Sequence, residues 1–220
     1  MKIFFKKKKI KSYKDLGFQA SSEENFANLI FIIDIIKELD YFVFFGTLLG
    51  LIRDNFLIEG DDDIDIYVNK KQKERLISLL KKNSIDVDLN LSVNKGDYFL
   101  QIKRTINNKH TIFDFYFFED DIDDLYIVER WNFGALTHDP SKHLRTPKIF
   151  IYPIQQIEIR SFKINIPAYP KYVCEFLYGR NWTKKLKKDQ EYTIKVIDGK
   201  PVMFKLRENF FGKKISFLES

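Results

Sequence analysis

Apolar residues follow helical spacing in two segments of the N-terminal half. In the first, Ser21 and Glu24 have the spacing of a capping box, which marks the point where a helix begins. The apolar residues after it recur every three or four positions, so the pattern predicts an amphipathic helix over residues 22–39. In the second, four apolar residues within 76–80 would form the inner side of an exposed helix over residues 71–82.

Short apolar or alternating runs predict β-strands through most of the remaining chain. Strands are expected at residues 41–45, 63–69, 87–93, 98–103, 111–118, 150–154, 157–162 and 163–166. Shorter helices are expected at 47–53 and at 169–178, where Gly179 ends the second one.

The connecting segments and the tail complete the picture. Residues 120–124 are expected to form a solvated acidic turn, and residues 129–148 are the least regular part. In the tail, Asp198-Gly199 between two alternating runs predicts a β-hairpin. Together the elements predict an α+β fold with a small mixed β-sheet flanked by helices, to which the C-terminal helix and hairpin are additions.

Basic residues are concentrated at the N-terminus. Seven of the 37 Lys and Arg residues, and none of the 31 Asp and Glu residues, lie in residues 1–14, so the formal net charge of +6 belongs to this segment. The remainder has 30 basic against 31 acidic residues, which argues against a basic surface for nucleic acid. The segment is either a solvated, frayed terminus or a basic apolar anchor that rests on anionic lipid headgroups.

Two absences narrow the class of protein. Cys174 is the only cysteine, which excludes an internal disulfide and a cysteine-based zinc site, and its apolar surroundings favour a buried thiol over a nucleophile. No run approaches the roughly 18 apolar residues of a membrane span, and the start lacks a signal-peptide pattern. We therefore expect a cytoplasmic protein whose membrane contact, if any, is peripheral and made by residues 1–14 at the inner face.

The most informative stretch is FFGTLLGLIRDNFLIEGDDDIDIYV, at residues 44–68. Asp63 and Asp65 alternate with isoleucines, so on a strand both carboxylates point to one face and the isoleucines to the other. Adjacent carboxylates repel each other unless a cation lies between them, and oxygen ligands favour Mg²⁺ or Mn²⁺. Asp114, within the apolar run TIFDFYFF, is the best candidate for a third carboxylate, because an unpaired buried Asp is costly.

Gly46, Thr47 and Arg53 are candidates for the phosphate side of the same site. Gly46 and Thr47 lie where a strand passes into a helix, and the N–H groups of a helix N-terminus can bind a phosphate. Arg53 follows one or two turns later and can make a forked contact to phosphate oxygens. Each part also has a purely structural explanation. The Gly-Thr pair could be a simple turn, the run of aspartates could be a solvated loop, and Asp114 could be a core residue that accepts hydrogen bonds from the backbone. The combination favours a metal-dependent phosphoryl-transfer site, with Asp61 and Asp62 as loop or supporting residues.

The order of these motifs is that of the nucleotidyltransferase superfold, and the stretch more specifically resembles the LicD/fukutin family. That family's signature reads roughly GTLLG-x-x-R, followed by an Ile-Pro-Trp-Asp-x-Asp-x-Asp block. The segments YPI at 152–154, FKINIP at 162–167 and LYGRNW at 177–182 are similar to its later motifs. The resemblance spans roughly residues 22–185, with two departures: Glu59-Gly60 replaces the usual Pro-Trp, and Lys184-Lys185 replaces later prolines.

The resemblance implies a phosphotransferase with a nucleotidyltransferase-like core. Together with the charge pattern, it predicts a basic N-terminal segment at residues 1–20, the catalytic core at 21–130, and at 131–220 an extension of the same domain that contributes to the substrate site. Relatives move phosphocholine, glycerol phosphate or ribitol phosphate from a CDP-linked donor to a hydroxyl of a glycan, such as a capsule or lipopolysaccharide, and release CMP.

The resemblance also implies roles for the candidate residues. Asp63 and Asp65 would hold the metal, and Asp114 would complete its coordination or accept the proton of the attacking hydroxyl. Gly46-Thr47 and Arg53 would hold the donor phosphates. Tyr178, Trp182, Trp131 and the three histidines are either substrate contacts or packing residues.

Two other functions fit the same residues. One is a nucleotidyltransferase that moves NMP from an NTP to a small molecule or protein, and the other is a non-catalytic protein that binds a glycan or nucleotide. Retention of all three carboxylates argues against the second alternative. Product analysis separates the two enzymes, because phosphotransfer releases CMP and nucleotidyl transfer releases pyrophosphate.

Overall fold

The computed structural model describes residues 20–87, 97–130, 138–185, 191–208 and 214–218. Its centre is a six-stranded sheet in the order β1-β2-β4-β5-β6, in which β3 also pairs with β4. β2 and β4 are parallel and the other paired neighbours are antiparallel, so the predicted mixed sheet is confirmed. The strands are β1 (Tyr41–Val43), β2 (Asp63–Asn69), β3 (Phe99–Ile106), β4 (Lys109–Asp120), β5 (Tyr126–Glu129) and β6 (Leu144–Pro147).

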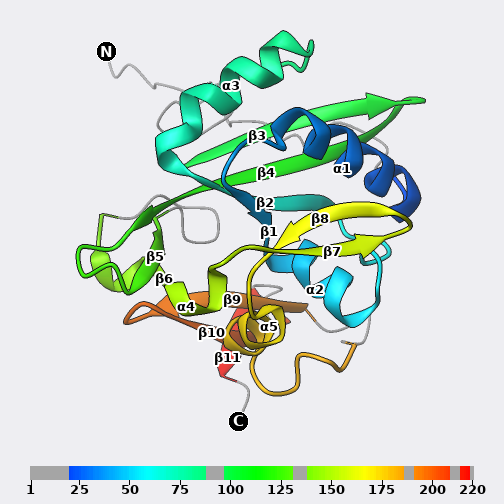
Figure 1. Ribbon diagram of the computed structural model, residues 1–220. Helices are drawn as coiled ribbons and strands as arrows, with labels where there is room; N and C mark the ends of the chain where they lie inside the picture. Colours follow the sequence, from blue (N-terminus) through cyan, green and yellow to red (C-terminus); the bar gives the residue numbers. More distant parts are fainter. Residues whose placement is uncertain (1–19, 88–96, 131–137, 186–190, 209–213, 219–220) are drawn as a thin grey trace, which may run out of the picture.

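Helices cover both faces of this sheet (Figure 1). α1 and α3 lie on one face, while α2, α5 and a separate three-stranded sheet lie on the other. The helices are α1 (Ser22–Ile36), α2 (Phe45–Arg53), α3 (Lys73–Lys82), α4 (Lys148–Ile151) and α5 (Pro170–Tyr178), with 3-10 turns at Lys70–Gln72 and Pro140–Lys142. The remaining strands are the hairpin β7 (Gln155–Ile159) and β8 (Phe162–Ile166), and the sheet of β9 (Glu191–Ile197), β10 (Lys200–Glu208) and β11 (Lys214–Leu218).

Alternation along β2 and β4 divides the sheet into an apolar face and a face that carries acids. Ile64 and Ile66 on β2, with Phe113 and Phe115 on β4, are buried in the core. They lie on the face that contacts α1, because Thr111, two residues before Phe113, bonds to Asn28 of α1. The residues that alternate with them, including Asp65 on β2 and Asp114 opposite it on β4, point to the other face, which α2 covers. The period of two therefore places the carboxylates and the core packing on opposite sides of the same strands.

α1 begins as predicted and is tied to β4 by buried polar contacts. Ser21 N–H donates to a Glu24 carboxylate oxygen at 2.8 Å and the Ser21 hydroxyl accepts from Glu24 N–H, so the capping box is confirmed. The Asn28 amide donates to the Thr111 hydroxyl at 2.6 Å, and that hydroxyl donates to the Asn25 side chain at 2.7 Å. These bonds satisfy three buried polar groups where α1 crosses the apolar face.

Several predicted elements are confirmed. The β2 prediction has the observed bounds, α5 ends at Gly179 with a positive φ of 77°, and Asp198-Gly199 turns between β9 and β10. The predicted strand at 41–45 is shorter, because Phe45 already begins α2. The strand predicted at 87–93 falls almost wholly within 88–96, outside the described residues.

Other predictions in the second half are wrong. Residues 150–154 contain the end of α4 instead of a strand, because Pro147 begins a helical turn after β6. The two strands predicted from 157 to 166 are shifted, because Arg160-Ser161 forms the hairpin turn with positive φ angles at both residues. Within 129–148, predicted as irregular, β5 ends at Glu129 and β6 is regular.

The acidic turn at 120–124 is paired with basic residues instead of being simply solvated. The Lys148 ammonium lies 3.0 Å from Asp120 and also pairs with Asp124. Arg145 pairs with Asp121, whose side chain is only 12% exposed. The turn therefore joins the β4–β5 connection to β6 and α4 through ion pairs.

Two further expectations concern burial and membranes. Cys174 is buried in α5, and burial raises the pKa of its thiol to about 12, so the thiolate needed for a nucleophile is not formed near neutral pH. Among the described residues, none of the helices has the length and apolarity that a membrane crossing requires. The basic segment at 1–14 lies outside the described residues, so its contact with lipid stays a prediction.

Candidate metal and phosphoryl-transfer site

Three carboxylates from two parallel strands converge on the α2 face of the sheet. Asp65 on β2 lies directly opposite Asp114 on β4, and Asp63 lies one alternation earlier on β2. Carboxylate oxygens of the three residues lie within 4.8 Å of one another, and Asp65 and Asp114 are only 6% and 5% exposed. The structure thus brings together the three acids that the sequence predicts to act together. An acidic cluster of this kind could hold a divalent metal ion.

The start of α2 fixes the position of Asp65. Gly46 N–H donates to the Asp65 Oδ2 atom at 3.1 Å, and the buried Thr47 hydroxyl accepts from Asp65 N–H at 2.9 Å. Phe44 N–H also donates to the Asp65 carbonyl at 3.1 Å. The predicted Gly-Thr motif therefore supports a carboxylate through the strand-to-helix turn, and its predicted contact with phosphate stays a prediction.

Asp61 lies closer to the cluster than the sequence predicts. Asp61 and Asp62 form a second acidic group with Asp63, within 4.8 Å of one another. A Cβ atom at Gly46 would lie 2.8 Å from Asp61 Oδ2 and 3.5 Å from Asp65 Oδ2, so the Asp61 carboxylate faces the same turn as Asp65. The loop before β2 therefore adds at least one acid to the face of the site.

The Gly46 geometry predicts the effect of adding one methyl group. Gly46→Ala should lower turnover by about 10- to 100-fold, the range for disturbing a group that orients a metal ligand, because the new Cβ displaces the Asp61 carboxylate beside Asp65. Stability should be unchanged or slightly higher, since Ala is favoured over Gly in a helix. Parallel activity and thermal-unfolding measurements check this, and normal turnover in Gly46→Ala would show that the close approach has no functional importance.

Gln101 on β3 is a site residue that motif analysis misses. It lies opposite Asp114 in the β3–β4 pairing, and its amide donates to Asp114 Oδ1 at 2.7 Å. This bond orients one carboxylate oxygen of Asp114. The signal in the sequence is the alternation of polar Gln101 and Lys103 with apolar Leu100 and Ile102, but only the register shows which acid Gln101 faces.

Replacing Gln101 with leucine tests this support. Gln101→Leu should weaken Mn²⁺ binding by about 10- to 100-fold, because outer partners of metal ligands typically contribute that much. Titration followed by electron paramagnetic resonance measures the affinity. Gln156→Leu, an exposed amide on β7, is the matched control and should bind Mn²⁺ like the wild type. Equal affinities in both variants would contradict a supporting role for Gln101.

Tyrosines surround the carboxylates and stay protonated. Burial, and after it the charges of Asp65, Asp114 and Asp63, raises the pKa of the Tyr116 phenol well above its usual value. Burial and then the charge of Asp65 do the same for the pKa of Tyr178, a residue of α5. Each phenol therefore remains neutral near pH 7 and adds no negative charge to the acidic cluster.

Arg53 lies at the end of α2 and is engaged by its neighbour in sequence. Its guanidinium makes a forked contact with Asp54, at 3.2 and 2.9 Å, and Lys185 approaches the same carboxylate at 3.1 Å. The side chain of Arg53 is mostly buried, and its charge opposes the rise in the Tyr178 pKa. Arg53 thus lies close enough to Tyr178 to influence its pKa, and its predicted contact with donor phosphates stays a prediction.

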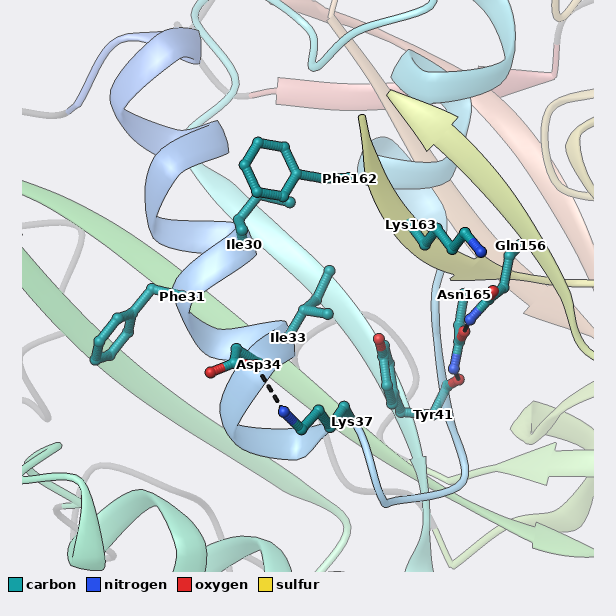
Figure 2. Close-up of a pocket in the computed structure, with 10 residues that line it drawn as sticks. All are labelled: Ile30, Phe31, Ile33, Asp34, Lys37, Tyr41, Gln156, Phe162, Lys163 and Asn165. Carbon is teal, nitrogen blue, oxygen red and sulfur yellow. Dashed lines mark hydrogen bonds and ion pairs between the residues drawn. The ribbon is translucent and has the colours of Figure 1, made fainter. Parts of the chain in front are cut away.

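A cavity of about 540 Å³ lies apart from these residues, between α1 and the β7–β8 hairpin (Figure 2). It is lined by apolar side chains such as Ile30 and Phe162, with Lys37, Lys163 and Asn165 at its polar parts. None of the residues that line it belongs to the acidic cluster.

Comparison with known proteins identifies the family. A family model described as the LicD/FKTN/FKRP nucleotidyltransferase domain matches residues 38–169, more than half of the chain. This chain belongs to the LicD family. The matched region contains β1, α2, β2, β3 and β4, and with them every candidate residue of the site.

Membership of the LicD family confirms the predicted nucleotidyltransferase-like core and indicates a transferase, of phosphotransferase type and acting on glycans. No curated protein matches the chain. Among solved structures, the chain is similar to the lincosamide antibiotic adenylyltransferase LnuA in its lincomycin-bound crystal structure. That match has 12% sequence identity and a TM-score of 0.44, and it covers 69% of this chain and 82% of the other.

Proposed function

We propose that this LicD-family protein moves a phospho-substituent from a CDP-linked donor to a hydroxyl of a cell-surface glycan and releases CMP. The substituent is of the phosphocholine, glycerol-phosphate or ribitol-phosphate type. The observation that carries the proposal is the convergence of Asp63, Asp65 and Asp114 on the α2 face, within a chain of this family. Three oxygen ligands suit Mg²⁺ or Mn²⁺.

The chain's own residues prepare the transfer by position and charge. A divalent ion held by the carboxylates would polarise the phosphoryl oxygens and offset the negative charge of the donor diphosphate. Gly46 N–H and Gln101 hold Asp65 and Asp114 in place from opposite sides, so the ligand set is formed before the donor arrives. Arg53, whose charge acts on Tyr178, is the candidate for contact with the donor phosphates.

The proposed reaction is a single displacement at phosphorus. The acceptor oxygen forms a bond to the distal phosphorus, and the bond from that phosphorus to the bridging oxygen breaks, which leaves CMP. The proton of the acceptor hydroxyl passes to a carboxylate or to solvent. Asp114 either completes the ligand set or takes this proton, and metal affinity in a variant of Asp114 distinguishes the two roles.

A nucleotidyltransferase reaction is the second candidate, because the matched family model is itself a nucleotidyltransferase domain. In that reaction CTP or another NTP would be attacked at its α-phosphorus and would release pyrophosphate. The acceptor would be a small molecule or protein, because the body of the chain, outside residues 1–14, has no excess of basic residues to attract RNA.

Binding and product analysis test the proposal together. Thermal unfolding is measured with Mg²⁺ and, in turn, CDP-choline, CDP-glycerol, CDP-ribitol and CTP, since a ligand at one hundred times its dissociation constant adds about 2.7 kcal/mol. We expect one CDP-linked donor to stabilise the protein most and to yield CMP with a glycan acceptor. Consumption of CTP with release of pyrophosphate would replace the proposal with the second candidate.

A further inference from the structure

The pairing of β3 with β4 places Lys103 on the same face as the three carboxylates. In this register Gln101 lies opposite Asp114, and Lys103 lies opposite Ile112, two residues earlier on β4. On the other edge of β4, Ile112 lies opposite Asp63. Residues that lie opposite each other on neighbouring strands point to the same face of the sheet. Lys103 on β3, Ile112 on β4 and Asp63 on β2 therefore form a row across this face, with Ile112 in the middle.

Contacts of the neighbouring residues confirm this orientation. Arg104, the next residue on β3, points to the other face, where its guanidinium lies 3.9 Å from the centre of the Phe31 ring and donates to Asn28 of α1. The charge of Lys103 contributes, after burial, to a lowered pKa of His110, which precedes Ile112 by two positions on β4. Lys103 therefore lies on the acid-bearing face and is itself partly buried.

The distances along the sheet allow the Lys103 ammonium to reach a ligand of the acidic cluster. Paired strands lie about 4.8 Å apart, so the backbones of Lys103 and Asp63 are separated by about 10 Å across β4. The residue between them, Ile112, is fully buried and offers no polar group. The four-carbon side chain at one end of this row can thus extend toward a molecule bound at the carboxylates at the other end.

The negative charges of the site favour a further cation beside the acidic cluster. The acidic cluster and its loop contribute five aspartates, Asp61, Asp62, Asp63, Asp65 and Asp114. A diphosphate adds further negative charge, which one divalent ion offsets only in part. Arg53, the cation expected from the sequence, makes its forked contact with Asp54. Lys103 extends from the strand that also carries the amide partner of Asp114.

We propose that Lys103 binds the diphosphate of the donor and stabilises the negative charge that develops on the departing nucleotide phosphate. This inference rests on the proposed function for the identity of the donor, although the phosphate contact itself does not depend on which group is transferred. The ammonium acts as a compact point charge with three donors, as lysines at phosphate sites commonly do. Its contribution grows as charge moves to the leaving oxygen.

The experiment compares Lys103→Met with Lys109→Met in the full-length protein. Lys109 begins β4 in the same hairpin, but its ammonium points to the other face and pairs with Glu24 of α1, so both variants lose one lysine charge. The probe is CDP at saturating Mg²⁺, with affinity measured by isothermal titration calorimetry. Mn²⁺ affinity without nucleotide and the thermal midpoint are measured on the same samples.

Lys103→Met should bind Mg²⁺–CDP about 10- to 100-fold more weakly, the loss expected for one charge-assisted hydrogen bond. Its Mn²⁺ affinity should be unchanged or higher, because a positive charge near the carboxylates has been removed. Where turnover is measurable, kcat should fall more than KM rises. Lys103→Arg should recover part of the affinity, and Lys109→Met should behave like the wild type.

Three outcomes would overturn the inference. The first is wild-type Mg²⁺–CDP affinity in Lys103→Met, and the second is no Mg²⁺–CDP binding by the wild type itself. The third is a parallel loss of Mn²⁺ affinity, CDP affinity and thermal midpoint, which a purely structural lysine would produce. The proposed function fails separately: a wild type that consumes no CDP-linked donor, while Lys103 still governs Mg²⁺–CDP binding, refutes the transfer reaction and keeps the phosphate contact.

Discussion

Asp65→Asn is expected to reduce turnover by roughly 1,000-fold or more, beyond the 10- to 100-fold typical of losing an outer partner of a metal ligand. Asp65 occupies the centre of the site, opposite Asp114 and held by Gly46 N–H. Asparagine keeps the size of the side chain but removes the charge that binds the cation. The fold should persist, because the Thr47 hydroxyl bonds to the backbone of Asp65 and not to its carboxylate.

The thermal midpoint of Asp65→Asn should show whether a loss of activity comes from the site or from unfolding. In the metal-free protein, neighbouring carboxylates repel each other, so removal of one charge should leave the thermal midpoint unchanged or raise it. Asp86→Asn, at an exposed position after α3, is the control and should retain full activity. Normal turnover of Asp65→Asn with Mg²⁺ would refute the assignment of Asp65 as a metal ligand.

Asp114→Asn is expected to reduce turnover to a similar degree. It should also lower Mn²⁺ affinity by at least about 10-fold, since loss of even an outer partner of a ligand typically costs that much. Asp114 is almost fully buried and accepts from the Gln101 amide at 2.7 Å. The oxygen of an asparagine amide can accept the same bond, so the β3–β4 contact should survive. The carboxylate charge is lost in either orientation.

The Mn²⁺ affinity of Asp114→Asn distinguishes the two possible roles of Asp114. A protein that keeps wild-type Mn²⁺ affinity but loses turnover would identify Asp114 as the acceptor of the hydroxyl proton instead of a ligand. A loss of both would identify it as a ligand. Retention of both affinity and turnover would remove Asp114 from the site altogether. Thermal unfolding of the same samples shows whether the protein remains folded.

The sequence predicts the strands that bear the acids because their signals are local. Asp63 and Asp65 alternate with isoleucines within seven residues, and the apolar run around Asp114 leaves few alternatives to a buried strand. Both patterns depend only on the period of two. That Asp114 joins Asp63 and Asp65 follows from chemical reasoning, since a buried carboxylate needs a partner. The parallel pairing of the two strands, with Asp65 opposite Asp114, is seen only in the structure.

The sequence does not predict the residues that act through register. Gln101 and Lys103 look like the polar side of an ordinary strand until the pairing with β4 places one opposite Asp114 and the other in the row of Asp63. Asp61 was expected in a supporting loop, and its approach to Gly46 depends on how that loop returns to β2. Tertiary packing decides such positions, and no local pattern encodes them.

The errors in the second half of the chain have a similar origin. The apolar run at 150–154 was predicted as a strand, but its packing against α5 favours the short helix α4. The hairpin turn at Arg160-Ser161 contains neither Gly nor Asn, the residues that usually signal positive φ. In contrast, the Asp198-Gly199 turn has the expected composition and was predicted correctly.

Crystals of the protein soaked in Mn²⁺ and CDP test the central claim most directly, by anomalous diffraction. We predict one strong anomalous peak at the α2 face, within about 2.0 to 2.3 Å of carboxylate oxygens from Asp63, Asp65 and Asp114, the distance range for a hard divalent ion. The peak should be absent from Asp65→Asn crystals prepared in the same way. A wild-type crystal with no peak between these three residues, or with its principal peak elsewhere, would contradict the account.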